Sequence, residues 1–241
     1  MTSFKFNEPR QITIAAAADL KFALDSIITV FKKENPGTQV NVVYGSSGKL
    51  FEQISNDAPF DLFFSADISY PSMLKERGMA ISEVKTYGIG RIVLWSKKLD
   101  PNKAKMNILL DRSISKIAMA DPAHAPYGQR AEESLKYYGL FDKVQNELVF
   151  GENISQTAQF VTSGAADIGI IALSLALSPA MQKEGGYYYL IPDESHSKLE
   201  QAFVILKHAL GNDLALTFSN YVSSSEAKKI LGFYGFRDKA S

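Results

Sequence analysis

Residues 12–20 read ITIAAAADL, and this stretch decides how the fold of the whole chain is interpreted. It begins as an apolar, strand-like run, passes through four alanines and ends at an aspartate and a leucine. The residues that follow place their apolar side chains on one helical face, which ENPG at residues 34–37 brings to an end. A strand followed at once by an amphipathic helix is the repeating unit of an α/β protein.

The same order of strand, small or hydroxyl residues and helix recurs along the chain. It is found in YGSSGKL (44–50), FDLFFSAD (60–67), APYGQR (125–130) and GENISQ (151–156). This alternation predicts an α/β fold in which mainly parallel sheets are flanked by helices. Residues 215–236, ALTFSNYVSSSEAKKILGFYGF, predict one closing helix followed by a tail.

Two long extended segments interrupt this alternation, VKTYGIGRIVLWSKK at 84–98 and KLEQAFVILK at 198–207. Because they enclose a middle section, we expect two lobes that are each built partly from distant parts of the chain. The first lobe is predicted to contain residues 10–87 and 203–241, and the second residues 88–202. Hinge crossings are expected near 85–90 and 198–204, and ligand contacts from both lobes imply closure by a hinge motion.

Composition excludes several classes of function. Lysine plus arginine and aspartate plus glutamate both number 26 in the 241 residues, so net charge gives no reason to expect nucleic acid or an anionic membrane as partner. Cysteine is absent, which excludes disulfides, thiolate metal sites and a lipid anchor on cysteine. MTSFKFNEPRQ at the start lacks the apolar core of a secretion signal, so an exported protein would begin here after its cleavage point.

The motifs of common enzymes and metal sites are missing from the sequence. The three histidines, His124, His196 and His208, show no metal-binding spacing, and there is no nucleophile elbow or phosphate-binding P-loop. YGIGRIV has two glycines of a dinucleotide fingerprint but neither the third glycine nor a following helix. We therefore expect a binding protein with no cofactor and no metal cation site, rather than an enzyme.

The recurring strand-to-helix junctions indicate an anion site. The first amides of a helix have no partner within the helix and carry a partial positive charge. Several such ends that converge between two lobes bind an anion without lysine or arginine, and small residues let the backbone come close to it. In the alternative interpretation, the alanines pack in a buried strand, and Ser46 and Ser47 only cap a helix.

Six segments in the same order resemble the periplasmic molybdate-binding proteins of ABC importers, and the resemblance covers almost the whole chain. These segments are ITIAAAADLKFALDSIITVFKK, YGSSGKLFEQI, APFDLFFSAD, ADPAHAPYGQRAEESL, GIIALSLALSP and ILGFYGF. The resemblance implies a two-lobed type II solute-binding fold that closes over one tetrahedral oxyanion, molybdate or tungstate. It also implies a monomeric periplasmic protein that delivers this anion to a membrane permease.

The resemblance also implies which residues contact the oxyanion. The contacts from the first lobe fall on Ala18, Asp19 and Ser47, and those from the second lobe on Tyr127 and on the backbone amide of Ile154. Some relatives add a tyrosine after the GII strand. That position is Ala172 here, so no phenol is available there, and Ser174 is a candidate substitute.

Asp19 departs from the pattern of the family, since many relatives have serine, threonine or asparagine there. An ionised carboxylate repels a dianion such as molybdate. In one arrangement Asp19 turns away and caps the helix by accepting from the amide of Lys21 or Phe22. In the other its carboxylate accepts a hydrogen bond from a protonated oxyanion, which favours phosphate.

Two further functions stay open at this point. A phosphoryl-handling enzyme would hold its substrate at the same helix ends and would need a base, for which His124 is the candidate. A carboxylate-binding protein of the same fold would need a fixed arginine for bidentate pairing, and none of the five implied contact positions is an arginine.

Overall fold

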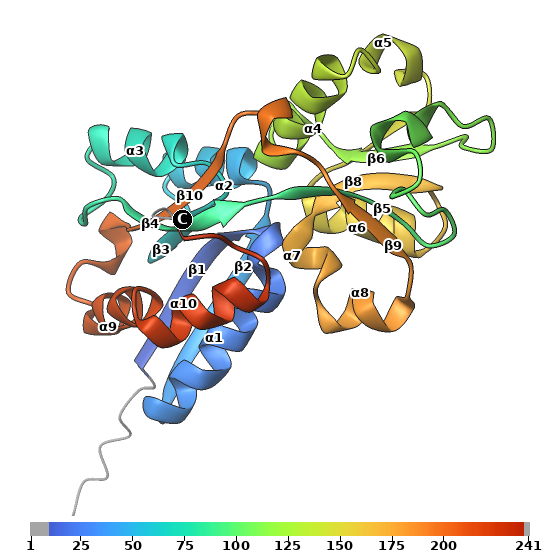
Figure 1. Ribbon diagram of the computed structural model, residues 1–241. Helices are drawn as coiled ribbons and strands as arrows, with labels where there is room; N and C mark the ends of the chain where they lie inside the picture. Colours follow the sequence, from blue (N-terminus) through green and yellow to red (C-terminus); the bar gives the residue numbers. More distant parts are fainter. Residues whose placement is uncertain (1–9, 239–241) are drawn as a thin grey trace, which may run out of the picture.

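The computed structural model describes residues 10–238, and these residues form two α/β lobes side by side (Figure 1). The expectation about the absent secretion signal falls largely on residues 1–9, which lie outside the described residues. Each lobe is built around one five-stranded sheet. We call the lobe that contains the first strand lobe I and the other lobe II.

The sheet of lobe I has the strand order β2-β1-β3-β10-β4. Its strands are β2 (Thr38–Gly45), β1 (Arg10–Ala17), β3 (Leu62–Ser65), β10 (Leu199–Ile205) and β4 (Lys85–Gly90). Residues 12–17 of the stretch ITIAAAADL therefore lie inside the sheet, where Ile14 is in register with Val42 on one side and Leu62 on the other. This position explains why almost all of its side chains are buried.

Helices cover both faces of this sheet. Strand side chains alternate between the faces, so Ile14 and Ala16 pack towards one group of helices, and Ala15 and Phe63 towards the other. The first group contains α1 (Lys21–Glu34), α9 (Asp213–Val222) and α10 (Ser225–Phe233). The second contains α2 (Ser47–Ser55) and α3 (Ser69–Glu76). Figure 1 shows α1 and α10 on one side of the sheet and α2 and α3 on the other.

Lobe II repeats this plan with the strand order β7-β6-β8-β5-β9. The strands are β7 (Leu148–Gly151), β6 (Ile117–Ala120), β8 (Ile168–Ala172), β5 (Ile92–Ser96) and β9 (Tyr187–Leu190). Its helices are α4 (Pro126–Tyr137), α5 (Phe141–Val144), α6 (Ile154–Thr162), α7 (Leu173–Ala176) and α8 (Pro179–Glu184). One apolar cluster fills this lobe and extends to Ala17, Ala18 and Ala66 of lobe I.

Both sheets are mixed, whereas the sequence patterns predict mainly parallel ones. In lobe I the pairs β1–β2 and β1–β3 are parallel, but β10 is antiparallel to β3 and β4. In lobe II β5 is likewise antiparallel to β8 and β9. The reason is that β5 and β10 are the strands that enter each lobe from the other, and such a strand need not follow the direction set by strand-helix-strand units.

The chain passes between the lobes at Arg91 and again between Leu190 and Leu199. Residues 88–90 and 199–202, which the sequence places in the second lobe, pair within the sheet of lobe I. We keep the division into two lobes joined by a hinge as a proposal, with these two crossings as the hinge.

The end of the chain forms two helices instead of the single one predicted. The helix α9 ends at Val222, and α10 begins after Ser224, whose hydroxyl accepts a hydrogen bond from the amide of Ala227. Because serine side chains bond to nearby backbone groups, a run of three serines favours a break with a new helix start over a continuous helix.

Candidate functional site

The site begins where β1 ends. The strand runs directly into a short 3-10 helix, η1 (Ala18–Leu20), and then into α1. Ala17 and Ala18 are buried against residues of lobe II, so larger side chains would hold the two lobes apart. The small residues at this junction therefore allow close approach of the lobes, as well as of a ligand.

Asp19 is the most informative residue of the site, because it is a carboxylate with only 1 % of its surface exposed. Its Oδ2 accepts hydrogen bonds from the hydroxyl of Tyr127 and from Nε2 of Gln201, both at 2.9 Å. Its Oδ1 has no hydrogen-bond partner. Burial raises the pKa of the carboxyl from 3.8 to about 6, although these donors oppose the shift.

This arrangement corrects the prediction that Asp19 caps the first helix. No side chain caps η1 or α1. Instead the carboxylate accepts from the phenol of Tyr127 in lobe II and from the amide of Gln201 in β10 of lobe I. The alternative in which Asp19 faces the ligand is compatible with these contacts.

Gln201 and Tyr87 hold this carboxylate in place. Neither residue was predicted from the sequence as part of the site. The hydroxyl of Tyr87 donates to Oε1 of Gln201 at 2.6 Å, which fixes the orientation of the amide. Nε2 of Gln201 also lies 3.0 Å from the hydroxyl of Tyr127. The available signal in the sequence was a glutamine directly before the apolar run AFVIL in KLEQAFVILK.

The second junction brings Ser46 and Ser47 to the start of α2. Ser46 precedes the helix, but its side chain caps nothing, and its buried hydroxyl oxygen has no partner. The hydroxyl oxygen of Ser47 accepts a hydrogen bond from the amide of Ala66 at 2.9 Å, which leaves the hydroxyl hydrogen free to be donated. The interpretation that these serines only cap a helix is therefore wrong.

Lobe II supplies two more helix starts. Tyr127 is the second residue of α4 and Ile154 is the first residue of α6. The side chain of Asn153 caps α6 by accepting from the amides of Ser155 and Gln156, so it does not take up the amide of Ile154. An amide at a helix start that the cap leaves free is suited to an anion.

Hydrogen bonds across the lobes bring all four junctions together. The hydroxyl of Ser155 donates to the carbonyl oxygen of Ala18 at 2.9 Å, beside Ile154. The amide of Gly48, next to Ser47, donates to the carbonyl oxygen of His124 at 2.9 Å. A Cβ at Gly48 would lie 2.7 Å from that oxygen, so only glycine permits this contact. The five residues named by the resemblance thus lie at one interlobe region.

Ser174 does not replace the missing tyrosine as a donor to a ligand in this structure. Its buried hydroxyl donates to the carbonyl oxygen of Asp19 at 2.8 Å, so its hydrogen is already used. Ala172 is fully buried at the end of β8. The phenol present at the site is that of Tyr127 in α4, whose hydroxyl donates to Oδ2 of Asp19.

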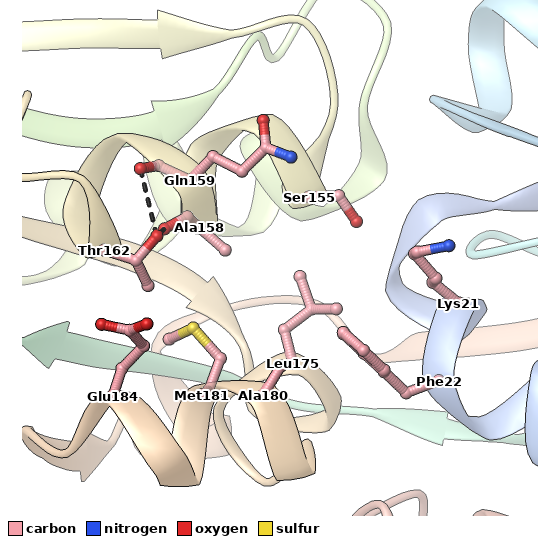
Figure 2. A pocket seen from close by; sticks show the side chains of 10 residues that line it. All are labelled: Lys21, Phe22, Ser155, Ala158, Gln159, Thr162, Leu175, Ala180, Met181 and Glu184. Atoms are coloured by element: carbon pink, nitrogen blue, oxygen red, sulfur yellow. Dashed lines mark hydrogen bonds between the residues drawn. The ribbon is translucent and has the colours of Figure 1, made fainter.

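A cavity of about 230 Å³ lies beside the site, at the seam between the lobes (Figure 2). Its lining comes from the start of α1 and from α6, α7 and α8, and the middle of it is formed by Phe22, Leu175 and Met181. Three of the polar side chains that line it are already paired, Lys21 with Asp25, Ser155 with the carbonyl oxygen of Ala18 and Thr162 with the carbonyl oxygens of Ala158 and Gln159. An oxyanion would therefore lose its hydration there and gain few donors in return. We therefore place the anion at the helix starts and not in this cavity.

Within residues 10–238 the structure contains no group of three or more histidine, aspartate or glutamate residues suited to a metal cation. None of the helices in the same residues is long and apolar enough to cross a membrane.

Comparisons with known proteins identify the family to which the chain belongs. Residues 12–237 match the family model of the bacterial extracellular solute-binding proteins, and the chain belongs to this family. It is 32 % identical over 228 residues to the molybdate-binding protein ModA of Rhodobacter capsulatus, covering 94 % of this chain and 88 % of that protein. It is 30 % identical to a putative ABC transporter substrate-binding lipoprotein, YvgL, of Bacillus subtilis, covering 93 % of this chain and 85 % of that protein.

Among solved structures, the fold is similar to that of the periplasmic molybdate-binding protein of Azotobacter vinelandii. The TM-score is 0.86 at 31 % identity, and the match covers 93 % of this chain and 98 % of that one. The prediction of a two-lobed solute-binding fold is therefore confirmed.

Proposed function

We propose that this protein binds molybdate between its two lobes and delivers it to the permease of an ABC importer. The anion contacts are Ala18, Asp19, Ser47, Tyr127 and Ile154, as the family resemblance implies. Tungstate is an equivalent ligand, since it is a tetrahedral dianion of the same shape. The protein acts as a periplasmic monomer that carries its ligand without converting it.

One observation carries this proposal. Helix starts from both lobes come together, and two of them hold buried oxygen atoms that have no hydrogen-bond partner. Oδ1 of Asp19 and Oγ of Ser46 are both buried without a hydrogen bond. Buried polar atoms are nearly always satisfied, and these two belong to the first and second strand-to-helix junctions, so both oxygens are available to a ligand held there. The partial positive charge of the helix starts favours an anion as that ligand.

The relatives support the identity of the anion and the transport role. The similar proteins of Rhodobacter capsulatus and Azotobacter vinelandii are named as molybdate-binding. The Bacillus subtilis relative is named as an ABC transporter component, which supports a permease as partner. The identities of about 30 % extend over nearly the whole length, so both lobes and not one shared module are compared.

Phosphate is the second candidate, and Asp19 is the observation that favours it. An ionised Oδ1 would accept a hydrogen bond from a protonated oxyanion, and phosphate keeps a proton at neutral pH whereas molybdate does not. Selectivity between phosphate and molybdate therefore depends on whether the Asp19 side chain is ionised.

Isothermal titration of the ligand-free protein with molybdate, tungstate, sulfate and phosphate tests the proposal. We expect molybdate and tungstate to bind with a stoichiometry of one. Sulfate meets the same donors but is smaller, and a closed site of fixed size loses some short contacts around it, so sulfate should bind more weakly. Phosphate binding without molybdate binding would contradict the proposal and support the second candidate.

A further inference from the structure

We propose that Asp19 contacts the bound oxyanion as a neutral carboxylic acid, so that binding of one molybdate takes up one proton. This inference rests on the proposed function and specifies the chemistry of the same site. Asp19 would contact an oxygen atom of the anion through its hydroxyl hydrogen, and it would thereby act as a donor like the other groups around the ligand.

The hydrogen bonds of the site determine which oxygen carries the proton. The hydroxyl of Tyr87 lies 2.6 Å from Oε1 of Gln201 and 3.1 Å from the carbonyl oxygen of Ser65, and we assign its hydrogen to the shorter contact. The other end of the Gln201 amide then donates, and it does so to Oδ2 of Asp19. The hydroxyl of Tyr127 donates to the same Oδ2. Oδ2 is therefore occupied as an acceptor of two hydrogen bonds. The backbone amides of Asp19 and Leu20 also lie near the carboxyl and lower its pKa, but Oδ1 makes no hydrogen bond with them and is the atom left to hold a proton.

Both phenols keep their protons in this arrangement. Burial, together with the negative charge of Asp19, raises the pKa of Tyr127 above its ordinary value, and the same two causes act on Tyr87. The direction of the hydrogen bonds is thus fixed from Tyr87 through Gln201 to Asp19. Because neither phenol ionises near neutral pH, Asp19 is the group of this network that titrates.

A neutral Asp19 removes the conflict between a carboxylate and a dianion. The ionised form would repel molybdate in a site from which water is excluded, whereas the acid form repels nothing and donates a hydrogen bond. Burial already raises the pKa of Asp19 to about 6 without a ligand, so protonation at neutral pH is accessible. A nearby dianion raises this pKa further.

No cation competes with the proton for Asp19, since none of the ion pairs found among residues 10–238 includes this carboxylate. The basic residues near the four helix starts have acidic partners of their own: Lys21 with Asp25, Lys49 with Glu152, and Arg130 with Asp67 and Glu133. The side chains from α6 and α7 that hydrogen-bond to the backbone of Ala18 and Asp19 are the neutral Ser155 and Ser174.

The test is isothermal titration of molybdate at pH 7.5 in buffers with different heats of ionisation, which counts the protons taken up. We expect a value close to one per molybdate, and a dissociation constant that rises about tenfold per pH unit between pH 7 and 9. Tight molybdate binding without proton uptake would overturn the inference and leave the proposed function intact. If the protein binds no molybdate at all between pH 5 and pH 9, both the inference and the proposed function are overturned.

Two variants locate the proton. Asp19→Asn should abolish the proton uptake and make the dissociation constant independent of pH, since the amide donates without titrating. Asp25→Asn is the matched control, because Asp25 is an exposed carboxylate six residues away on α1, and it should keep the uptake of the unmodified protein. Proton uptake that persists in Asp19→Asn would contradict the inference. If this variant does not fold, the proton count of the unmodified protein decides alone.

Discussion

Ser47 shows how one residue serves the fold and the ligand together. Its oxygen accepts the amide of Ala66, while its hydrogen remains available to an anion. Ser47→Ala also removes the acceptor of the Ala66 amide, so it should lower the stability of the protein while the fold is kept. It should weaken molybdate binding by about 1.5 to 3 kcal/mol, the usual range for a hydrogen bond to a charged group. Titration calorimetry measures this loss.

The control for this change is Ser69→Ala. Ser69 is the first residue of α3, as Ser47 is of α2, but it is exposed. Its replacement should leave the affinity unchanged. An equal affinity for Ser47→Ala and the unmodified protein would show that the loop at residues 44–50 does not hold the anion.

Asp19 also makes stability depend on pH when no ligand is present. Its pKa is about 6 in the folded protein and 3.8 ordinarily, so the folded state binds the proton more tightly than the unfolded state. The stabilising contribution is complete below pH 3.8 and is lost as the pH rises through 6. The shift corresponds to about 3 kcal/mol.

The prediction is that Asp19→Asn gains stability relative to the unmodified protein as the pH rises from 4 to 8, by about 3 kcal/mol. Urea unfolding at several pH values measures the difference. A difference between the two proteins that stays constant over this range would show that Asp19 is not a buried, titrating group.

Sequence reasoning located the strand-to-helix junctions but not the contacts between them. Ala18, Asp19, Ser47, Tyr127 and Ile154 all lie at strand-to-helix junctions, which local patterns indicate. The partner of Asp19 was mispredicted because the nearest candidates along the chain, Lys21 and Phe22, were preferred. Gln201 is 182 positions away from Asp19, and only the tertiary fold brings it to the carboxylate.

At the scale of elements, Gly90 at the end of β4 packs against Gln201 and Tyr127 of the site. A Cβ on Gly90 would lie 2.4 Å from both Nε2 of Gln201 and the hydroxyl of Tyr127. Gly90→Ala should therefore displace these donors from Asp19 and weaken molybdate binding by about 1.5 to 3 kcal/mol, although Gly90 itself does not contact the ligand.

Gly232→Ala is the control for this change, because a Cβ at that position of α10 has no atom within 4 Å. It should leave binding as it is. Titration calorimetry on both variants, with circular dichroism to verify the fold, checks the prediction. Unchanged binding in Gly90→Ala would mean that the network of Tyr87, Gln201 and Tyr127 does not position the ligand contacts.

The element types were predicted better than their directions and ends. Hydrophobic periodicity locates β1, β2, α1 and α2, because each has one clear apolar pattern. The antiparallel direction of β5 and β10 follows from how the chain crosses between lobes, which a local pattern does not contain. The break between α9 and α10 depends on the serine cap at Ser224.

At the scale of the whole molecule, an ion pair holds the lobes together near the site. Arg130 of α4 contacts Asp67 of lobe I at 2.9 Å, and both side chains are largely buried, with 11 % and 19 % exposed. Asp67→Asn should weaken the closed form, and with it molybdate binding, by about 1.5 to 3 kcal/mol, since a charged hydrogen bond is lost.

The comparison is Lys49→Gln, which removes another ion pair between the lobes. Lys49 and Glu152 are 39 % and 56 % exposed, and exposed pairs contribute about 0 to 1 kcal/mol. Calorimetry should therefore find a larger loss for Asp67→Asn than for Lys49→Gln. The reverse order would contradict the role of the Arg130 pair in closure.

The class of the whole molecule was predictable because six segments in order resemble one family. The contacts between lobes were not, since Arg130 with Asp67 and Ser155 with Ala18 join residues 63 and 137 positions apart. Such pairs depend on how the lobes close, and no periodicity or motif in a single segment encodes that.

The most direct test of the central claim is the anomalous diffraction of tungsten in crystals of the protein grown with tungstate. We predict one strong peak per molecule between the starts of α2, α4 and α6, in contact with Ser47 and beside Asp19. A peak in the apolar seam cavity near Phe22 and Met181, or no ordered peak between the lobes, would contradict the account.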